Sequence, residues 1–166
     1  YINLPLFIID KFNRGLFSLT HFSDIIRMAL LLKYGGYWID STYFLTAPIK
    51  IISNTFYTLK LKHCFTYTHP FIKCIWSGNF LAVSKNSFIA RYCYMAFINY
   101  WKKYDFIVDY FLIDYIIYIA YIKSSKFKSI IDNLPIINCD IFSLSNSLNF
   151  NYNPKYFDCP FNKLSK

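Results

Sequence analysis

A long apolar stretch that ends in two consecutive glycines constrains the fold more than any other feature. Residues 16–34 form one predicted helix, whose first turn Ser18 or Thr20 can cap. The double glycine at 35–36 supplies the left-handed backbone that ends such a helix. Residues 37–39, Tyr-Trp-Ile, predict a short buried strand directly after the reversal. A helix, a sharp turn and a strand in this order predict an α/β fold.

The chain has room for one domain. Its 166 residues are 55% hydrophobic and 16% charged, which excludes intrinsic disorder because such a chain can bury a core. We therefore expect a single domain over residues 1–166, with its core over 1–122 and an irregular C-terminal part over 123–166. The other predicted elements are an extended segment at 43–46, a strand or hairpin at 56–67, a turn feeding a strand at 70–82, and helices at 86–104 and 104–122.

The net charge of +9 restricts the classes of partner. It comes from 18 basic and 9 acidic residues, and the basic residues are spread along the chain. Only Arg14, Arg27 and Arg91 are arginines, whereas nucleic-acid-binding proteins more often present a dense stripe that contains several. We therefore expect no nucleic acid partner. The charge suits an anionic small molecule or the acidic inner surface of a membrane.

The five cysteines are an odd number and include no C-x-x-C pair, which predicts scattered reduced thiols of an intracellular protein. Cys64, His69 and Cys74 reproduce three ligand positions of a zinc knuckle, but Leu61 stands where the first ligand belongs. A zinc site is therefore the less favoured interpretation. The longest apolar run, 106–122, is interrupted by two aspartates and is too short to span a bilayer.

Every side-chain carboxylate is an aspartate, since Glu does not occur in the chain. Asp24 and Arg27 are three residues apart, which puts them on one face near the start of the predicted helix. The free N–H groups and positive dipole of that helix end suit a phosphate or a ribose. The predicted strand delivers Asp40 to the carboxyl edge of a sheet, where open α/β sheets bind ligands. Asp24, Arg27 and Asp40 are therefore predicted to converge on one anionic ligand; the plainer alternative is a surface ion pair and an aspartate in a turn.

Two further aspartates lie within the predicted apolar helix at 104–122. Asp109 shares a face with Asp105, and Asp114 lies elsewhere around the helix. A carboxylate in such a helix needs a partner, so at least one of them is expected to face a cavity or a lysine. We predict Asp109 as a catalytic base or acceptor contact and Asp114 as an acceptor contact. The alternative is that both lie on a helix surface.

The stretch from residue 23 to residue 40 resembles the signature of the capsular polysaccharide synthesis family of glycosyltransferases. That signature runs S-D-x-x-R, a helix, and G-G-x-[WY]-x-D. This chain meets it at Ser23, Asp24, Arg27, Gly35, Gly36, Trp38 and Asp40. Downstream blocks of the family resemble Trp76, Gly78, Asn79 and Phe80 and the segment 104–115, so the resemblance covers residues 1–122. The family is similar to family 32 sugar transferases and, more distantly, to the glucosylating domains of large clostridial toxins.

The resemblance implies a GT-A-like fold and a nucleotide-sugar donor. Its implied donor-binding residues are Ser23, Asp24, Arg27, Gly36 and Trp38. Its implied acceptor or sugar pocket holds Trp76, Gly78, Asn79 and Asp114, although a buried tryptophan beside a Gly-Asn turn is an equally good interpretation of the first three.

Asp40 matches the first aspartate of the D-x-D motif of such enzymes and is the implied catalytic residue. Asp40 and Thr42 are the implied ligands of Mn²⁺ or Mg²⁺, which would stabilise the diphosphate that leaves the donor. Thr42 stands where the second aspartate belongs, and a hydroxyl is a weaker metal ligand than a carboxylate.

The predicted function is transfer of a sugar, with retention, from a nucleotide-sugar donor to a capsular or other surface polysaccharide. Acceptors of this kind are often lipid-linked oligosaccharides, so we expect a cytoplasmic protein with peripheral contact at the inner membrane face. One alternative is an inactive remnant or interaction module, because Thr42 breaks D-x-D and the uracil-binding strand of the fold is expected upstream of Tyr1. The other, less favoured, is a basic nucleic-acid-binding domain.

Overall fold

The chain folds into a mixed α/β structure, seen in a computed structural model that describes residues 2–49, 56–62 and 75–164. The helices are α1 (Leu6–Asn13), α2 (Leu19–Tyr34), α3 (Phe88–Lys103), α4 (Leu112–Lys123), α5 (Ser125–Asp132), α6 (Ser143–Ser147) and the 3-10 helix η1 (Pro154–Phe157). The strands are β1 (Gly36–Ile39), β2 (Tyr43–Leu45), β3 (Phe56–Thr58), β4 (Lys60–Leu61), β5 (Phe80–Val83), β6 (Ile136–Ile137) and β7 (Phe161–Lys163). The predicted α/β class is confirmed.

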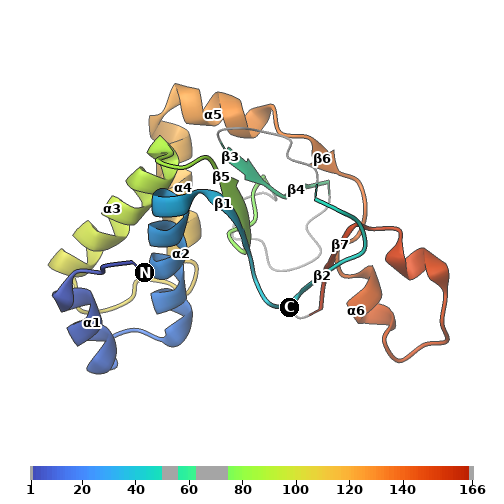
Figure 1. Cartoon of the computed structure of the whole chain (residues 1–166), viewed down its shortest axis with the longest axis horizontal. Coiled ribbons are helices and arrows are strands. Elements are labelled where there is room, and N and C mark those ends of the chain that lie inside the picture. Colours follow the sequence, from blue (N-terminus) through green and yellow to red (C-terminus); the bar gives the residue numbers. More distant parts are fainter. Residues whose placement is uncertain (1, 50–55, 63–74, 165–166) are drawn as a thin grey trace.

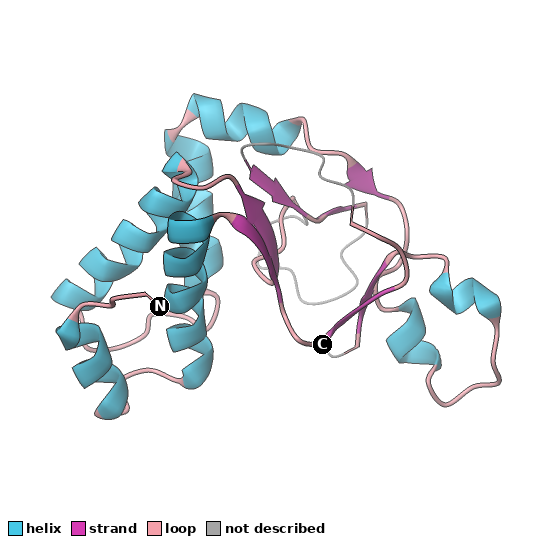
Figure 2. Ribbon diagram, in the orientation of Figure 1, coloured by secondary structure: helices cyan, strands magenta, loops and turns pink. Residues whose placement is uncertain are grey.

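Helices α1 to α4 gather on one side of the molecule, and the strands lie beside them (Figure 1). Helix α2 packs against α3, α3 against α4, and α4 against α5. Figure 2 shows α5 crossing above the strands, with α6 on the side far from α1. The core between these layers contains fully buried Ile25, Phe80, Trp101, Ile117 and Phe127. Removal of this apolar surface from water is the main favourable term that holds helices and strands together.

Strand β5 is the centre of a three-stranded sheet, with β1 and β3 antiparallel to it on either side. Every residue of β3 and β5 is buried, whereas β1 is exposed at its start and half-buried at its end. The prediction of a strand at 37–39 is confirmed, but its prediction as a buried strand is wrong, because β1 is an edge strand of this sheet. Among the described residues, β2 also pairs with β7 (antiparallel) and β4 with β6 (parallel).

The turn between α2 and β1 is the local feature that the sequence predicts best. Ser18 occupies the N-cap of α2, with its hydroxyl 2.8 Å from His21 Nδ1. Gly35 ends the helix with φ +68° and ψ −158°, and Gly36 follows with φ +87°. Both values lie in the left-handed half of backbone space, which side chains other than glycine rarely occupy. A Cβ added to Gly35 would lie only 2.5 Å from the backbone nitrogen of Lys85.

The two glycines therefore differ in how much a side chain would cost. We expect Gly35→Ala to lower the free energy of unfolding by about 2 kcal/mol or more, because it adds a clash with the backbone at Lys85 to the cost of a strained φ. Gly36→Ala is the matched control, since its added Cβ meets no atom of the described residues within 4 Å and only the backbone cost remains. Urea unfolding of both variants measures the difference. Equal losses in the two variants would contradict the close approach at Gly35.

The predicted helix over 104–122 begins only at Leu112, so this prediction is wrong for its first turns. Side chains hold the preceding segment in another conformation. The Tyr100 hydroxyl accepts from the Val108 N–H at 3.0 Å and donates to the Phe106 carbonyl at 2.8 Å. Such side-chain bonds to the backbone compete with a helix for the same groups. The helix predicted over 86–104 is confirmed as α3.

The C-terminal part is predicted to be irregular over 123–166, which is wrong for its described residues, because they form α5, β6, α6, η1 and β7. Helix α5 buries Phe127 and Ile131, which are four residues apart on one face. Strand β7 pairs with β2, which brings the end of the chain back to the segment that follows β1. Cys139 and Cys159 form a disulfide in this part, so the prediction of reduced thiols is wrong for this pair.

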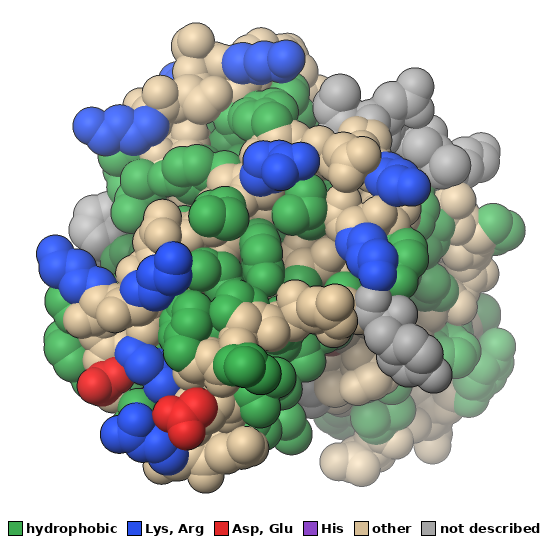
Figure 3. All heavy atoms as spheres, turned by 60° about the vertical axis from the view of Figure 1, so that its left-hand side comes forward, with side chains coloured by type: hydrophobic (Ala, Val, Ile, Leu, Met, Phe, Trp, Pro, Cys, Tyr) green, Lys and Arg blue, Asp and Glu red, His purple; other side chains and the backbone are tan. Residues whose placement is uncertain are grey.

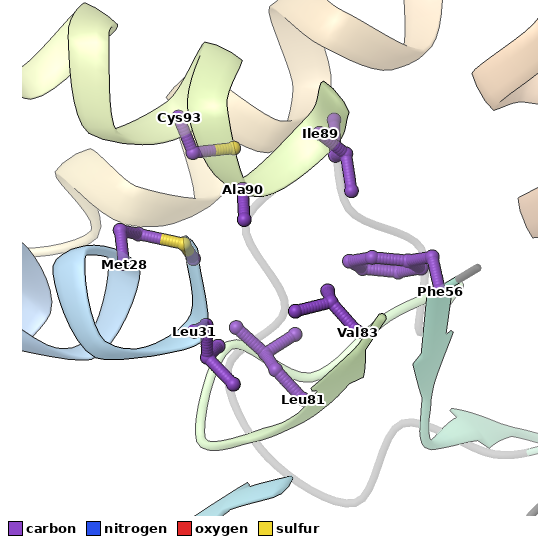
Figure 4. A pocket seen from close by; sticks show the side chains of 8 residues that line it. All are labelled: Met28, Leu31, Phe56, Leu81, Val83, Ile89, Ala90 and Cys93. Atoms are coloured by element: carbon purple, nitrogen blue, oxygen red, sulfur yellow. The ribbon is translucent and has the colours of Figure 1, made fainter. Parts of the chain in front are cut away.

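A small cavity lies between α2, α3 and the three-stranded sheet (Figure 4). Its lining is entirely apolar apart from one thiol: Met28, Leu31, Phe56, Leu81, Val83, Ile89, Ala90 and Cys93. Cys93 is free and buried, and burial raises the pKa of its thiol to about 12. A thiol that stays protonated at neutral pH is a poor nucleophile. The cavity therefore belongs to the core, and we place no chemistry in it.

Three of the residues weighed for zinc, Cys64, His69 and Cys74, lie outside the described residues. The part of the predicted strand at 56–67 that can be compared forms β3 and β4. In the part of the chain that the structure describes, no helix is long and apolar enough to cross a membrane.

Candidate functional site

Helix α2 carries Asp24 and Arg27 on the face that points into the molecule. Their side chains are only 5% and 7% exposed, and Arg27 Nη2 lies 3.2 Å from Asp24 Oδ1. The i,i+3 spacing of a helix makes this contact, as the sequence predicts. Ser23 lies one residue earlier, about 100° around the helix, and is half-buried.

Asp40 approaches the same arginine from the end of β1. Arg27 Nη2 lies 3.2 Å from Asp40 Oδ1, and the indole Nε1 of Trp38 donates to that oxygen at 2.9 Å. The Arg27 guanidinium also lies over the Trp38 ring, 4.9 Å from its centroid. A planar cation between two carboxylates and an aromatic face is a strongly fixed arrangement. The predicted convergence of Asp24, Arg27 and Asp40 is confirmed, whereas their role toward a ligand stays a prediction.

Asp40 reaches Arg27 by another route than the predicted one, which was delivery to the carboxyl edge of an open α/β sheet. Asp40 follows an edge strand of an antiparallel sheet and not the carboxyl edge of an open parallel one. What brings it to Arg27 is the reversal at Gly35 and Gly36, which lays β1 back beside α2. A turn then holds Asp40 in place, because its N–H donates to the Asn79 carbonyl at 3.1 Å and its carbonyl accepts from the Tyr43 N–H at 3.0 Å.

Burial dominates the protonation of Asp24. It raises the pKa of this carboxyl to about 7, with further upward contributions from the negative charges of Asp114 and Asp40 and a downward one from Arg27. The lowering by the Arg27 charge is smaller than the raising by burial, so the net change in the pKa is upward. A group that titrates near neutral pH inside a charged cluster is typical of functional sites.

This shift gives stability a defined pH dependence. Because the pKa of Asp24 is raised from 3.8 to about 7, the folded state holds this proton more tightly than the unfolded state. The resulting stability is complete below about pH 4 and is lost as the pH rises to about 7. We therefore expect the unfolding free energy of the wild type, minus that of Asp24→Asn, to decrease as the pH rises from about 4 to about 7. Above about pH 7 the difference should stay constant. Urea titrations from pH 4 to 8 measure it, and a difference that grows with pH would contradict the raised pKa.

The turn at residues 76–79 closes the site from the other side. The Gly78 carbonyl accepts a hydrogen bond from Arg27 Nη1, and the Asn79 side-chain oxygen accepts from the Tyr43 hydroxyl at 2.9 Å. The Ser77 N–H donates to Thr58 Oγ1 at 2.8 Å, which fixes the turn to β3. The structure thus places two of the predicted pocket residues, Gly78 and Asn79, directly beside the Arg27–Asp40 pair.

Trp76 and Asp114 lie behind this turn. The Trp76 indole Nε1 donates to Asp114 Oδ1 at 3.0 Å, and both side chains are buried. A Cβ added at Gly78 would lie 3.3 Å from the same Asp114 oxygen, so a glycine lets the turn approach α4 closely. Asp114 therefore has a partner, as a carboxylate in an apolar helix needs, but the partner among the described residues is an indole N–H and not the predicted cavity or lysine. The negative charge of Asp114 contributes to the raised pKa of the Asp24 carboxyl.

Asp109 and Gly36 do not join the cluster through any contact among the described residues. The Asp109 carboxylate accepts from the Phe111 N–H at 2.8 Å in the loop before α4, so its predicted place on a helix face is wrong. Its predicted catalytic role stays a prediction. Gly36 forms the reversal, and a Cβ added there would meet no atom of the described residues within 4 Å.

Sequence patterns alone do not indicate Lys163, which completes the charged cluster. Its Nζ donates to the Thr42 hydroxyl, lies 3.7 Å from Asp40 Oδ2, and sits 5.1 Å from the centroid of the Tyr43 ring. The side chain is only 10% exposed. Burial lowers the pKa of the Lys163 ammonium, and the Asp40 carboxylate opposes this shift. Only the pairing of β7 with β2 brings this lysine to residues 40–43.

The residues expected to hold Mn²⁺ or Mg²⁺ are already engaged by cations. Asp40 Oδ1 faces Arg27, Asp40 Oδ2 faces Lys163, and the Thr42 hydroxyl bonds to Lys163. Mg²⁺ requires near-octahedral oxygen coordination, and Mn²⁺ favours the same carboxylate and carbonyl oxygens. Within residues 2–49, 56–62 and 75–164, no group of three or more His, Cys, Asp or Glu side chains could hold a metal ion. This set of donors does not fit a divalent cation.

The charged cluster thus consists of Asp24, Arg27, Asp40 and Lys163, and it reaches the surface at Asp40, whose side chain is 28% exposed. No curated protein and no solved structure matches the chain. A family model described as "Capsular polysaccharide synthesis protein" matches residues 1–164. This match confirms the resemblance seen at residues 23–40 and extends it to the strand that carries Lys163. The chain therefore belongs to the family of capsular polysaccharide synthesis proteins.

Proposed function

We propose that the protein is a glycosyltransferase with a GT-A-like fold. It moves a sugar from a nucleotide-sugar donor to a capsular or other surface polysaccharide, or to a lipid-linked oligosaccharide precursor. The observation that carries this proposal is the buried Arg27, held between Asp24 and Asp40 in a chain of the capsular polysaccharide synthesis family.

The chemistry of sugar transfer explains why such a cluster is useful. The bond between the anomeric carbon and the phosphate oxygen breaks, and its electron pair leaves with the nucleoside diphosphate. The acceptor hydroxyl oxygen bonds to the anomeric carbon, and its proton passes to the departing diphosphate. Positive groups fixed in advance stabilise the negative charge that develops on the leaving group. We assign this role to Arg27, whose guanidinium is always charged and matches phosphate geometry.

The remaining residues divide between donor and acceptor. Asp24 contacts the ribose or the sugar, Trp38 orients Arg27 through its ring, and Asp40 contacts the sugar while it holds Arg27. Asn79, half-buried in the turn beside Asp40, contacts the acceptor sugar. Attack from the face that the diphosphate leaves gives retention of configuration at the anomeric carbon.

Nucleotide release tests this proposal. Purified protein is incubated with UDP-, GDP- and CMP-sugars, with water in place of the acceptor, and the free nucleotide is measured. We expect one base to be favoured and release from that donor to be saturable. Absence of both release and nucleotide binding across the whole panel would contradict the proposal and favour a non-catalytic interaction module.

We also propose that the protein contacts the inner face of the membrane, where lipid-linked acceptors are found. Figure 3 shows one face of the molecule on which lysine and arginine side chains are spread among hydrophobic ones. A net charge of +9 attracts anionic lipid headgroups, and the attraction is screened by salt. Sedimentation with phosphatidylglycerol vesicles at low and high salt measures it. Protein that stays in the supernatant at low salt would contradict membrane contact.

A further inference from the structure

Lys163 contacts both residues, Asp40 and Thr42, that the family resemblance implies as metal ligands. Its ammonium contacts Asp40 Oδ2 at 3.7 Å and donates to the Thr42 hydroxyl. Asp40 Oδ1 is meanwhile taken by Arg27 at 3.2 Å and by Trp38 at 2.9 Å. The carboxylate that would be the main metal ligand thus faces two positive side chains.

Backbone hydrogen bonds hold the strand that carries this lysine. The Lys163 N–H donates to the Ile141 carbonyl at 2.7 Å, and the Leu164 N–H donates to the Thr42 carbonyl at 2.8 Å. Asn162, the preceding residue, is fully buried and donates through Nδ2 to the Cys159 carbonyl at 2.7 Å. Strand β7 therefore holds the ammonium beside Asp40 from a part of the chain 121 residues away from Thr42.

Two members of the cluster, Arg27 and Lys163, are cations that can bind a diphosphate without help from a metal. Arg27 and Lys163 flank Asp40 on its two oxygens, so two positive groups meet at the one member of the cluster that is partly exposed. Lysine and arginine both bind phosphate through charge-assisted hydrogen bonds. An ammonium does not require the near-octahedral set of oxygens that Mg²⁺ does.

We propose that Lys163 and Arg27, rather than a divalent cation, supply the positive charge that the leaving diphosphate meets. This inference rests on the proposed function. As the bond from the anomeric carbon to the phosphate oxygen breaks, the electron pair goes to the diphosphate, and Lys163 moves its hydrogen bond from Thr42 to a phosphate oxygen. Thr42 then positions the ammonium before the reaction and is not a metal ligand.

The test compares the wild type with Lys163→Met and Lys163→Arg, each in EDTA and in Mn²⁺. Two quantities are measured: release of nucleotide from the favoured donor and the dissociation constant of UDP or GDP. We expect the wild type to keep its rate in EDTA. We expect Lys163→Met to lose about 100-fold in rate and to bind the nucleoside diphosphate about tenfold more weakly, as loss of a charged phosphate contact implies. Lys155→Met, an exposed lysine of η1, is the matched control and should behave as the wild type.

Rescue by arginine separates a charge contact from a purely structural one. The charged groups that face the Lys163 ammonium are Asp40 and Arg27, and the Tyr43 ring lies beside it. Lys163→Arg should keep more activity and bind the nucleoside diphosphate more tightly than Lys163→Met, because a guanidinium also carries a positive charge that can bind phosphate. Equal rates and equal affinities of Lys163→Arg and Lys163→Met would overturn the contact.

The other outcomes are also decisive. Wild-type release that is abolished by EDTA and restored by Mn²⁺ would overturn this inference and leave the proposed function standing. Lys163→Met with wild-type rate and affinity would do the same. Absence of release and of nucleotide binding in the wild type under every condition would overturn the proposed function, and this inference with it.

Discussion

Replacement of Arg27 by methionine is expected to lower the free energy of unfolding by about 3–5 kcal/mol, the cost of breaking a buried ion pair from one side. Arg27 Nη2 neutralises Asp24 and Asp40 at 3.2 Å each, and Nη1 donates to the Gly78 carbonyl. Methionine fills most of the space but removes the cation, so at pH 7 the buried Asp24 carboxyl must take up a proton, and Asp40 and the Gly78 carbonyl lose a partner. We therefore expect Arg27→Met to be among the most destabilising substitutions in the chain.

Urea unfolding at pH 7 measures this loss. Arg14→Met is the matched control, because Arg14 also pairs with an aspartate, Asp10 at 3.4 Å, but is 60% exposed. Surface pairs of this kind contribute little, so we expect a change within about 0.5 kcal/mol. Addition of Asp24→Asn to Arg27→Met should recover part of the loss, because the amide carries no charge and the carboxyl must take up a proton to stay buried. Equal stabilities of Arg27→Met and Arg14→Met would show that the buried cluster does not hold the fold together.

Asp40→Asn is expected to reduce nucleotide release at least 100-fold, the usual effect of removing one fixed charge contact from an active site. The amide keeps the shape of the side chain and an oxygen for the Trp38 indole, which donates at 2.9 Å. It loses the negative charge that holds Arg27 and Lys163 on either side. Because Asp40 is partly exposed, the fold should survive, and the change should fall on the rate.

Initial rates with the favoured donor measure this effect, and thermal unfolding shows that both proteins are folded. Asp10→Asn, an exposed aspartate of α1, is the control and should release nucleotide at the wild-type rate. A wild-type rate in a folded Asp40→Asn protein would contradict a role of Asp40 in the reaction.

The part of the site that the sequence predicts is the part made by neighbours along the chain. Asp24 and Arg27 meet because a helix brings residues three apart together, and Asp40 returns to them through Gly35 and Gly36. All of these signals lie within 17 residues, where helix periodicity and turn chemistry decide the conformation.

Lys163 is different, because its contact with Thr42 depends on the pairing of two three-residue strands far apart in the sequence. Strands of this length carry too little alternation to be predicted from a local pattern. The helix boundary at Leu112 was missed for another reason. Apolar composition favours a helix through 104–111, but the Tyr100 hydroxyl and the Asp109 carboxylate hold backbone groups of that segment.

The disulfide between Cys139 and Cys159 likewise depends on tertiary structure, since an odd number of cysteines without a local pair does not indicate it. Helix α5, in contrast, has a helical signal in the sequence. Its Phe127 and Ile131 have helical spacing, and Ser124 caps the first turn by accepting from the Phe127 N–H at 3.2 Å. The short length of α5 and the polar residues around it hide this pattern.

The tryptophan indoles offer the most direct test that the charged cluster binds the donor. The chain has three tryptophans. The Trp38 indole donates to Asp40 and the Trp76 indole to Asp114. Trp101 is fully buried against Phe17, with ring centroids 4.3 Å apart, and serves as the internal control. Substitution of each tryptophan by phenylalanine assigns the three indole N–H signals in an NMR spectrum.

The measurement is a titration of the ¹⁵N-labelled protein with UDP-, GDP- and CMP-sugars, followed through these three signals. We expect one donor to shift the Trp38 signal in a saturable way, with the Trp101 signal unchanged and the shift absent in Asp40→Asn. Signals that stay in place at millimolar concentrations of every donor, or a shift of Trp101 without one of Trp38, would contradict a nucleotide-sugar site at Arg27 and Asp40.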